Sequence, residues 1–226
     1  MNLEDEAIGK WPANVGSRET AYEFVHRVLR HVVLDGTLKE GARLFQTEIG
    51  ERLGVSTTPV REALHKLASE GLVDFGAGRG AVVHRLSTDE WREIGYIRRL
   101  LEPDALRRSA ERIDSQMLAE AERIHRLMNG ETDVVAWVDL NRQFHRIHYD
   151  AAESPRLTGI LMTLLDASTT YLARAIAERP EIAQQAQAEH AVIIEGLRRR
   201  DGDALEEAAI RHLARIPVPL ETALPT

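Results

Sequence analysis

The chain has 226 residues, of which 43% are hydrophobic and 29% are charged, and it contains no cysteine. This length and composition allow a buried core in one or two domains, and the lack of cysteine excludes a disulfide framework and a thiolate metal site. No apolar run approaches the length of a membrane span, and the acidic residues 1–6 are unlike a signal peptide. We therefore expect a cytoplasmic protein with no membrane partner.

The formal net charge of −7 is unevenly distributed along the chain. Residues 18–86 hold 10 Lys/Arg and 9 Asp/Glu, a net charge of +1. Residues 87–226 hold 18 and 24, a net charge of −6, and the first 17 residues contribute the remaining −2. The acidity therefore lies mainly outside residues 18–86. If this near-neutral part binds nucleic acid, it is expected to rely on a few placed contacts, doubled by dimerisation.

The periodicity of apolar residues predicts a first domain over residues 18–86, preceded by a loose arm over residues 1–17. The first expected helix is capped by Ser17 and ends near Asp35, and a turn over 38–43 follows it. A second helix is expected over 46–53, and a third is capped by Ser56 or Thr57 and ends at Gly71. A β-hairpin over 72–75 and 81–84 completes the domain. This order is the plan of a winged helix-turn-helix.

The stretch over residues 53–64 carries the strongest signal in the chain. Gly54 is expected to close the preceding helix in the left-handed conformation, and Pro59 suits the first turn of the helix that follows. In a helix-turn-helix the second helix lies in the major groove of DNA, with its N-terminal residues toward the bases. We therefore expect a DNA-reading helix that begins near residue 56.

Several exposed positions on and beside this helix are candidates for DNA contact. Arg61 could make a bidentate contact to guanine, and an ion pair with a neighbouring glutamate is the alternative. Arg79, at the glycine-rich wing tip, could enter a minor groove or remain a solvated loop residue, and Arg43 is placed to contact phosphate. The full set of expected DNA contacts is Arg43, Ser56, Thr57, Thr58, Arg61, His65, Arg79 and Gly80.

Beyond residue 86 the strand signal disappears and six helices are predicted. Ser87 and Glu90 form a capping box that starts the first of them. The fourth is expected to run unbroken over residues 155–178. Residues 87–216 should therefore form an antiparallel all-helical bundle, followed by a tail over 217–226. The expected fold class is mainly α, with an N-terminal winged helix-turn-helix and a C-terminal helical bundle.

Nine histidines stand in a chain without cysteine. His145, His190 and His212 adjoin apolar residues of different predicted helices and are expected to point inward, with Asn141 one turn before His145 on the same face. Such a set suits Zn²⁺, Ni²⁺ or a similar divalent ion, although inward histidines are more often hydrogen-bonded core residues. His148, one turn further along, is expected at the surface, and a role as substitute ligand is the alternative.

Five motifs of the first domain together resemble the DNA-binding head of the GntR superfamily. They are GARL at 41–44, LGVS at 53–56, TPVREAL at 58–64, EGLV at 70–73 and RGAVV at 79–83. The resemblance implies a homodimeric, ligand-responsive transcriptional regulator, usually a repressor, that binds a short palindromic operator in double-stranded DNA. The family usually has arginine where this chain has Thr57, so the operator is expected to differ from the common one.

The second domain resembles the FCD effector domain of the FadR-like branch of that superfamily. The motifs are RRLLE at 98–102, NRQFH at 141–145 and the stretch from His190 to His212. Many FCD domains hold a divalent metal with one aspartate and three histidines, and the matching positions are Asn141, His145, His190 and His212. A neutral amide in place of the carboxylate should weaken metal binding or admit an anionic effector more readily.

Arg98 matches the arginine of the family's R-x-x-L-E pattern. It could pair with the carboxylate of a small effector, or form an ion pair with Glu102 one turn away. The leading hypothesis is a regulator, not an enzyme, whose helical domain binds a small carboxylate beside the metal. A purely structural metal, or none, is one alternative. A metalloenzyme is a weaker one, because Glu189 adjoins His190 and is expected on a different face, which leaves no placed acid or base.

Overall fold

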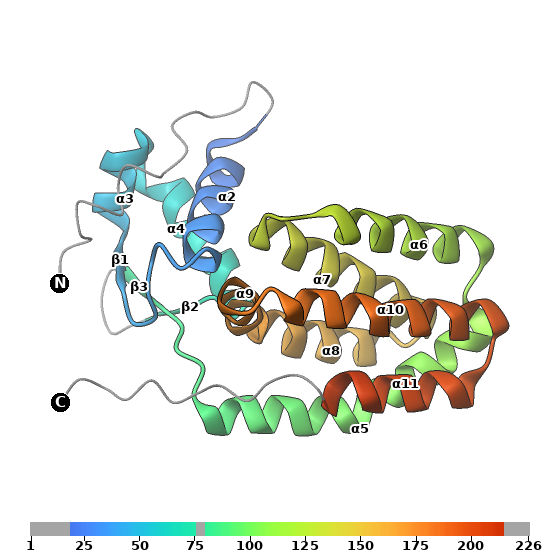
Figure 1. Ribbon diagram of the computed structural model, residues 1–226. Helices are drawn as coiled ribbons and strands as arrows, with labels where there is room; N and C mark the ends of the chain where they lie inside the picture. The colour runs from blue at the N-terminus through green and yellow to red at the C-terminus, as the bar shows by residue number, and fades with distance from the viewer. Residues whose placement is uncertain (1–18, 76–79, 215–226) are drawn as a thin grey trace. The chain divides into compact units, whose positions relative to one another are not determined.

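The computed structural model describes residues 19–75 and 80–214. The chain divides into two compact units, Met1–Arg85 and Leu86–Thr226, here called the head and the helical unit. Figure 1 shows helices in both units and a small sheet in the head. The fold class is the expected one, mainly α with a winged head and a helical bundle. Within the described residues, no helix is both long and apolar enough to cross a membrane.

The described helices of the head are α2 (Ala21–Leu34), α3 (Gln46–Leu53) and α4 (Thr57–Ser69). α2 begins at a capping box, in which the Glu23 amide donates to Oγ1 of Thr20 (3.2 Å) and the Thr20 amide donates to Oε2 of Glu23 (2.8 Å). The cap expected at Ser17, which lies outside the described residues, is therefore wrong by one turn of helix. The apolar stripe of α2 packs against α4.

The turn between α3 and α4 depends on two glycines. Gly54 has a φ of 68°, the left-handed conformation expected of it, and the amide of Val55 donates to the carbonyl of Gly50 (2.9 Å). Gly50 has no room for a side chain, because a Cβ there would lie 2.9 Å from the carbonyl oxygen of Val55. The chain can therefore turn sharply enough for α4 to pack on α3, as in a helix-turn-helix.

The wing is a three-stranded sheet with strand order β1-β3-β2. β2 (Val73–Phe75) and β3 (Gly80–Val83) form the expected hairpin, and β1 (Arg43–Phe45) pairs antiparallel with the other edge of β3. The turn predicted over residues 38–43 is present, with the amide of Ala42 donating to the carbonyl of Lys39 (3.0 Å), but its last residue, Arg43, already belongs to β1. The predicted two-stranded wing is wrong, because β1 adds a third strand. A strand of three residues is too short to show an alternating pattern, and β1 is stabilised by its pairing rather than by local preference.

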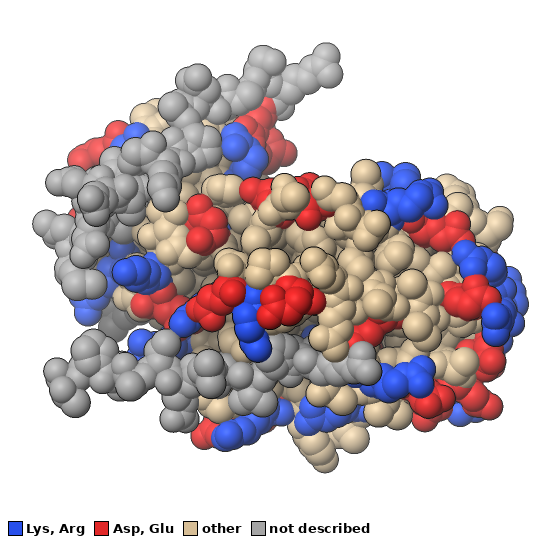
Figure 2. Space-filling view, viewed as in Figure 1, with Lys and Arg blue, Asp and Glu red and all other residues tan. Residues whose placement is uncertain are grey.

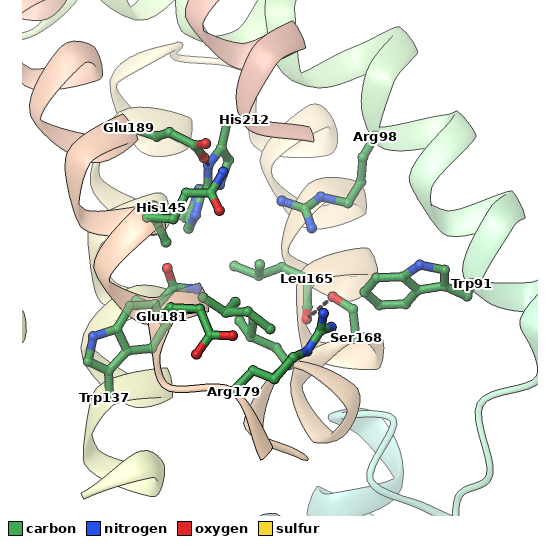
Figure 3. Close-up of a pocket in the computed structure, with 15 residues that line it drawn as sticks. Trp91, Arg98, Trp137, His145, Leu165, Ser168, Arg179, Glu181, Glu189 and His212 are labelled. Atoms are coloured by element: carbon green, nitrogen blue, oxygen red, sulfur yellow. Dashed lines mark hydrogen bonds and ion pairs between the residues drawn. The ribbon is translucent and has the colours of Figure 1, made fainter. Parts of the chain in front are cut away.

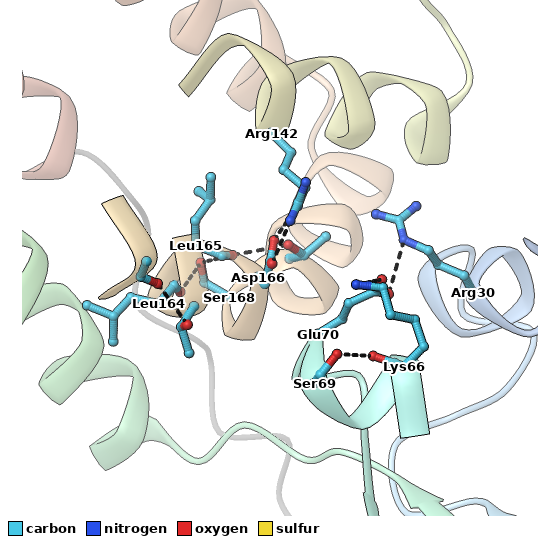
Figure 4. A network of polar contacts seen from close by, with 12 residues as sticks. Arg30, Lys66, Ser69, Glu70, Arg142, Leu164, Leu165, Asp166 and Ser168 are labelled. Carbon is cyan, nitrogen blue, oxygen red and sulfur yellow. Dashed lines mark hydrogen bonds and ion pairs between the residues drawn. The ribbon is translucent and has the colours of Figure 1, made fainter. Parts of the chain in front are cut away.

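A carboxylate at the end of α4 ties two helices of the head together (Figure 4). Glu70 lies 3.1 Å from Nε2 of His26 and 3.7 Å from Nε of Arg30, both on α2. It also lies 3.4 Å from Nζ of Lys66 on α4. Burial alone would raise the pKa of the Glu70 carboxyl, but these three neighbours outweigh it and hold the pKa below its usual value. The ionised carboxylate therefore fixes the end of α4 against α2.

The described helices of the helical unit are α5 (Thr88–Arg112), α6 (Ser115–Gly130), α7 (Val134–Ala151), α8 (Pro155–Ala167), α9 (Thr169–Glu178), α10 (Glu181–Arg199) and α11 (Gly202–Ala214). α7 packs on α5, α6 and α8, and α10 packs on α6 and α11 (Figure 1). The capping box expected at Ser87 and Glu90 is present, and Asp114 and Asp133 cap α6 and α7.

The long fourth helix predicted for residues 155–178 is two helices, α8 and α9, with a break at Ser168. The Ser168 hydroxyl donates to the carbonyls of Leu164 (3.2 Å) and Leu165 (2.8 Å), and the Thr169 hydroxyl donates to that of Leu165 (3.1 Å) (Figure 4). These hydroxyls compete with the amides that would continue the helix. The apolar spacing continues through the break, which is why periodicity does not reveal it.

Charged residues of the helical unit pair along and between its helices. Figure 2 shows basic and acidic side chains interspersed on the face in view. Within α7, Arg146 lies 2.8 Å from Asp150, and Arg198 of α10 lies 2.8 Å from Glu122 of α6. Exposed pairs of this kind contribute little each, so the acidic helical unit is held together by its buried residues.

Gly80 opens β3 where β1 approaches most closely. A Cβ at this position would lie 2.5 Å from the carbonyl oxygen of Leu44. We expect Gly80→Ala to destabilise the head by about 1–3 kcal/mol, because the strands must separate to make room. Urea unfolding followed by circular dichroism measures the loss. Gly159→Ala is the control, since nothing lies within 4 Å of a Cβ at that exposed position of α8. Equal losses in both variants would contradict the prediction.

Candidate functional site

Three histidines from three helices meet in the interior of the helical unit. His145 comes from α7, His190 from α10 and His212 from α11, and ring nitrogens of the three lie within 4.8 Å of one another. All three side chains are buried. Asn141, one turn before His145 on α7, is also buried and lines the adjoining cavity. The structure thus brings together the three histidines of the predicted site, and Asn141 lines the cavity beside them.

Neither ring nitrogen of His190 has a hydrogen-bond partner among the described residues. Burial lowers the pKa of His190 and of His145 well below the ordinary value, and neighbouring imidazoles lower it further. Both rings are therefore neutral at pH 7 and carry lone pairs. A buried polar group without a hydrogen-bond partner lowers the stability of a protein by about 1–3 kcal/mol. A bound metal ion would reduce this loss at His190, because it accepts the lone pair of a ring nitrogen. The donor set therefore fits a metal ion that prefers nitrogen.

Glu189 holds the third histidine in place. Its carboxylate accepts a hydrogen bond of 2.7 Å from Nδ1 of His212, which fixes the proton on Nδ1 and leaves the lone pair on Nε2. The expectation that Glu189 faces away from the site is therefore wrong. Successive residues of a helix are only about 100° apart, so a residue next to an inward histidine can line the same cavity.

His148 is fully buried, so the prediction of a surface position is wrong. It lies on the inner side of α7, where its ring packs edge-on to that of Phe144 (centroids 5.2 Å apart). Burial lowers the pKa of His148 to about 4, although the Glu102 carboxylate acts to raise it. Neither ring nitrogen finds a hydrogen-bond partner in the described part of the chain. Donor atoms of His148, His145 and Glu102 lie within 4.8 Å of one another, as a second group that shares His145 with the first.

Arg98 forms an ion pair with Glu102 and at the same time lines the cavity. Nε of Arg98 lies 3.0 Å from the Glu102 carboxylate, and the two residues are only 3% and 1% exposed. Burial opposes the charge on each group, but their attraction outweighs it, so the pKa of Arg98 is raised and that of Glu102 is lowered. Glu102 also lies 3.6 Å from Nδ1 of His145. Arg98 therefore forms the ion pair with Glu102 and still lies where it could meet the carboxylate of an effector.

A cavity of about 180 Å³ adjoins the histidines (Figure 3). Arg98, His145, Glu189 and His212 form a polar lining toward one end. Asn141 also lines the cavity. The remaining wall is largely apolar and includes Trp91, Trp137, Leu165, Leu172, Ile182 and Ala186. A concave, mostly apolar space with a few converging polar groups is the usual form of a small-molecule site.

The start of α4 is accessible in the head. All five residues expected on its DNA-facing side are exposed: Ser56, Thr57, Thr58, Arg61 and His65. Ser56 is the N-cap residue, but its side chain makes no capping bond and its hydroxyl remains available. Over the ranges that the structure describes, no carboxylate forms an ion pair with Arg61. The ion pair with a neighbouring glutamate, the alternative to a DNA contact, is therefore not formed.

The other expected DNA contacts lie on or near the wing. Arg43 is exposed on β1, and the ring of His65 packs on Phe75 of β2 with centroids 4.4 Å apart. Gly80 has a structural reason to be glycine, because β1 leaves it no space for a side chain. Arg79 lies outside the described residues.

The sequence matches two protein-family models in series. Residues 21–83 match the bacterial regulatory proteins of the gntR family, and residues 93–215 match the FCD domain, which by itself covers more than half of the chain. The chain belongs to the GntR family and carries an FCD domain. This GntR-family protein is therefore a transcriptional regulator with a DNA-binding head and an effector domain, and members of its family are regulators rather than enzymes.

Relatives of this GntR-family regulator carry names of the same kind. It is 29% identical over 198 residues to the HTH-type transcriptional repressor RspR of Escherichia coli K12, a match that covers 85% of each chain. It is also 32% identical over 143 residues to the HTH-type transcriptional regulator McbR of the same organism. That match covers 62% of this chain and 65% of McbR.

Solved structures of GntR-family regulators share the fold. The structure of E. coli McbR/YncC matches with a TM-score of 0.70 at 25% identity, over 86% of this chain and 94% of that one. A GntR family member from Pseudomonas syringae pv. tomato matches with a TM-score of 0.51 at 29% identity, over 86% of this chain and 82% of that one. The predicted family and fold class are thus confirmed.

The Arg98–Glu102 pair makes a testable contribution to stability. We expect Glu102→Ala to destabilise the helical unit by about 3–5 kcal/mol, because it leaves the Arg98 guanidinium buried without a counter-charge. Urea unfolding followed by circular dichroism measures the change. The control is Asp104→Ala, which removes the exposed partner of Arg108 (2.7 Å) on the same helix and should change stability little. A comparable loss from both variants would be incompatible with a special role of the buried pair.

Proposed function

We propose that this protein is a cytoplasmic repressor that binds a palindromic operator as a homodimer and responds to a small carboxylate bound beside a divalent metal ion. The observation that carries the proposal is the group of buried histidines, with unpartnered nitrogens on His190, next to a cavity lined by Arg98. An effector that binds one arrangement of the helical units better than another would change the spacing of the two heads on DNA.

Three neutral imidazoles and one amide oxygen would hold the metal. The residues are Asn141, His145, His190 and His212. Nitrogen donors of this kind suit Zn²⁺ and Ni²⁺. The hydrogen bond from His212 to Glu189 supports the proposal, because it sets the tautomer that leaves Nε2 free for a metal. When bound, the ion would act as a positive centre that holds one oxygen of the effector.

The balance of charges favours an anionic effector. The carboxylates of Glu102 and Glu189 would offset the charge on Arg98 and one of the two charges on the ion. Asn141 adds no charge, so one positive charge would remain in a buried place that disfavours it. A single carboxylate would neutralise the site, and Arg98 on the cavity wall offers it charge-assisted hydrogen bonds.

The head and the comparisons support the operator-binding part of the proposal. A near-neutral head makes modest non-specific contacts with DNA, and two linked heads bind with a higher overall affinity. A two-fold symmetric dimer matches a palindrome whose half-sites face its two recognition helices. The relative RspR is named a repressor, and we extend that direction of control to this chain.

Selection of sites from random double-stranded DNA tests operator binding, and we expect a palindrome. Arg61→Ala should then weaken operator binding by about 1–3 kcal/mol and relax the preference at one base pair of each half-site. Lys66→Ala is the control, because Lys66 lies in the last turn of the same helix and pairs with Glu70 within the head. Failure to select any palindrome, with or without zinc and carboxylates, would overturn the proposed repressor.

Asn141→Asp tests the metal site. We expect it to raise the affinity for Zn²⁺, because an anionic ligand replaces a neutral one, and to weaken carboxylate binding by removing the residual positive charge. His190→Ala should remove tight zinc binding. Competition with a chromophoric chelator measures both affinities.

A purely structural ion would behave differently. If stripping the metal with a chelator lowers thermal stability but leaves carboxylate affinity unchanged, the ion only holds the helices together. Unchanged zinc affinity in His190→Ala would show that the histidine cluster is not the metal site.

A further inference from the structure

The cavity of the helical unit has two chemically different parts. Arg98, His145 and His212 lie toward one end, where a charged group would find partners (Figure 3). Away from that end, the wall consists mainly of aliphatic and aromatic side chains. A ligand that fills the cavity therefore has its charge at one end and an apolar body along the rest of its length.

Two tryptophans contribute to the apolar wall. Trp91 from α5 and Trp137 from α7 line the cavity and are only 7% and 3% exposed. The indole of Trp91 is held by the ring of Tyr171 on α9, with centroids 4.2 Å apart and ring planes at 57°. Leu165 lies on the wall between the labelled tryptophans in Figure 3. A flat ring can pack against an indole of this wall, which adds an aromatic contact to the burial of the ring.

The volume of the cavity suits a ligand with one ring. An apolar cavity of about 150 Å³ in a protein interior is enough to bind benzene. The cavity here measures about 180 Å³, which leaves room for a small polar group attached to the ring. A single ring that carries one carboxylate therefore fits this space.

The same wall disfavours small polyacids. Midway along the cavity, a second carboxylate would lie against leucine side chains and indole carbons, and burying an unpaired charge there is costly. Arg179 and Glu181 also line the cavity, but both are exposed and lie toward the end opposite the histidines (Figure 3). The buried polar residues therefore recognise one anionic group rather than two.

We infer that the effector is an aromatic monocarboxylate with a single six-membered ring, whose carboxylate lies toward Arg98 and the histidines and whose ring packs on the apolar wall to which Trp91 and Trp137 contribute. This inference rests on the proposed function, because it takes the carboxylate site beside the metal as given. It adds the chemical class of the molecule to which the regulator responds.

Calorimetric titration of the zinc-loaded full chain with four probes tests the inference. Benzoate has the charge and the ring, acetate has only the charge, benzyl alcohol has only the ring, and succinate has two charges and no ring. We expect benzoate to bind at least about tenfold more tightly than each of the other three, since a tenfold change corresponds to about 1.4 kcal/mol, less than the burial of a ring provides.

Two variants assign this preference to the apolar wall. Trp137→Ala should weaken benzoate binding about tenfold and leave acetate binding unchanged, whereas Trp137→Phe should retain most of the preference. Ala186→Leu adds bulk to the wall and should exclude benzoate while still admitting acetate. The second variant keeps the test valid if Trp137→Ala does not fold. Tyr96→Ala is the control, because Tyr96 is an exposed aromatic residue of α5 that does not line the cavity.

The outcomes separate this inference from the proposed function. Equal affinities for benzoate and for acetate or succinate would overturn the aromatic class and leave the carboxylate site intact. An Ala186→Leu variant that loses benzoate and acetate alike would also overturn it. If no acid binds to the zinc-loaded chain, the carboxylate site itself is wrong, and the effector part of the proposed function is overturned with it.

Discussion

Charges can be buried in a helical bundle only if each is matched, and the Arg98–Glu102 pair meets this requirement at the centre of the helical unit. Glu102 also approaches Nδ1 of His145 at 3.6 Å, so the pair links α5 to the polar side of α7. Because the guanidinium is neutralised within its own helix, it can stand buried at the edge of a cavity. The ion pair, the histidines and the cavity therefore form one connected polar region inside an otherwise apolar bundle.

Most of the fold could be predicted because caps and turn glycines act locally. The capping box at Ser87 and the left-handed Gly54 are where the residue pattern places them. The start of α2 follows the same rule. Thr20 has Glu23 three residues later and forms a complete capping box, whereas Ser17 has no glutamate or glutamine three residues later. β1 could not be found in this way because it exists only through its pairing with β3. The break at Ser168 was also hidden, because hydroxyl groups that end a helix leave its apolar spacing unchanged.

The candidate site was predictable in its parts but not in its arrangement. His145, His190 and His212 could be chosen because helical spacing and the FCD resemblance select the same residues, and the structure brings them together. Glu189 and His148 were misplaced because the rotation of a helix about its own axis is set by packing, which a single sequence does not specify. In a helix surrounded by neighbours, such as α7, more than one face is buried, so an inner and an outer face cannot be separated by charge and polarity alone.

The corner between α8 and α9 is fastened by the hydroxyls of Ser168 and Thr169, which donate hydrogen bonds to the carbonyls of Leu164 and Leu165 in the last turn of α8. Leu172 and Arg179, on and just after α9, are therefore part of the cavity wall before any effector arrives. A receptor that is organised in advance loses little conformational entropy on binding, so more of the contact energy appears as affinity. A wall organised in this way favours molecules whose outline matches the cavity over those that would require the corner to move.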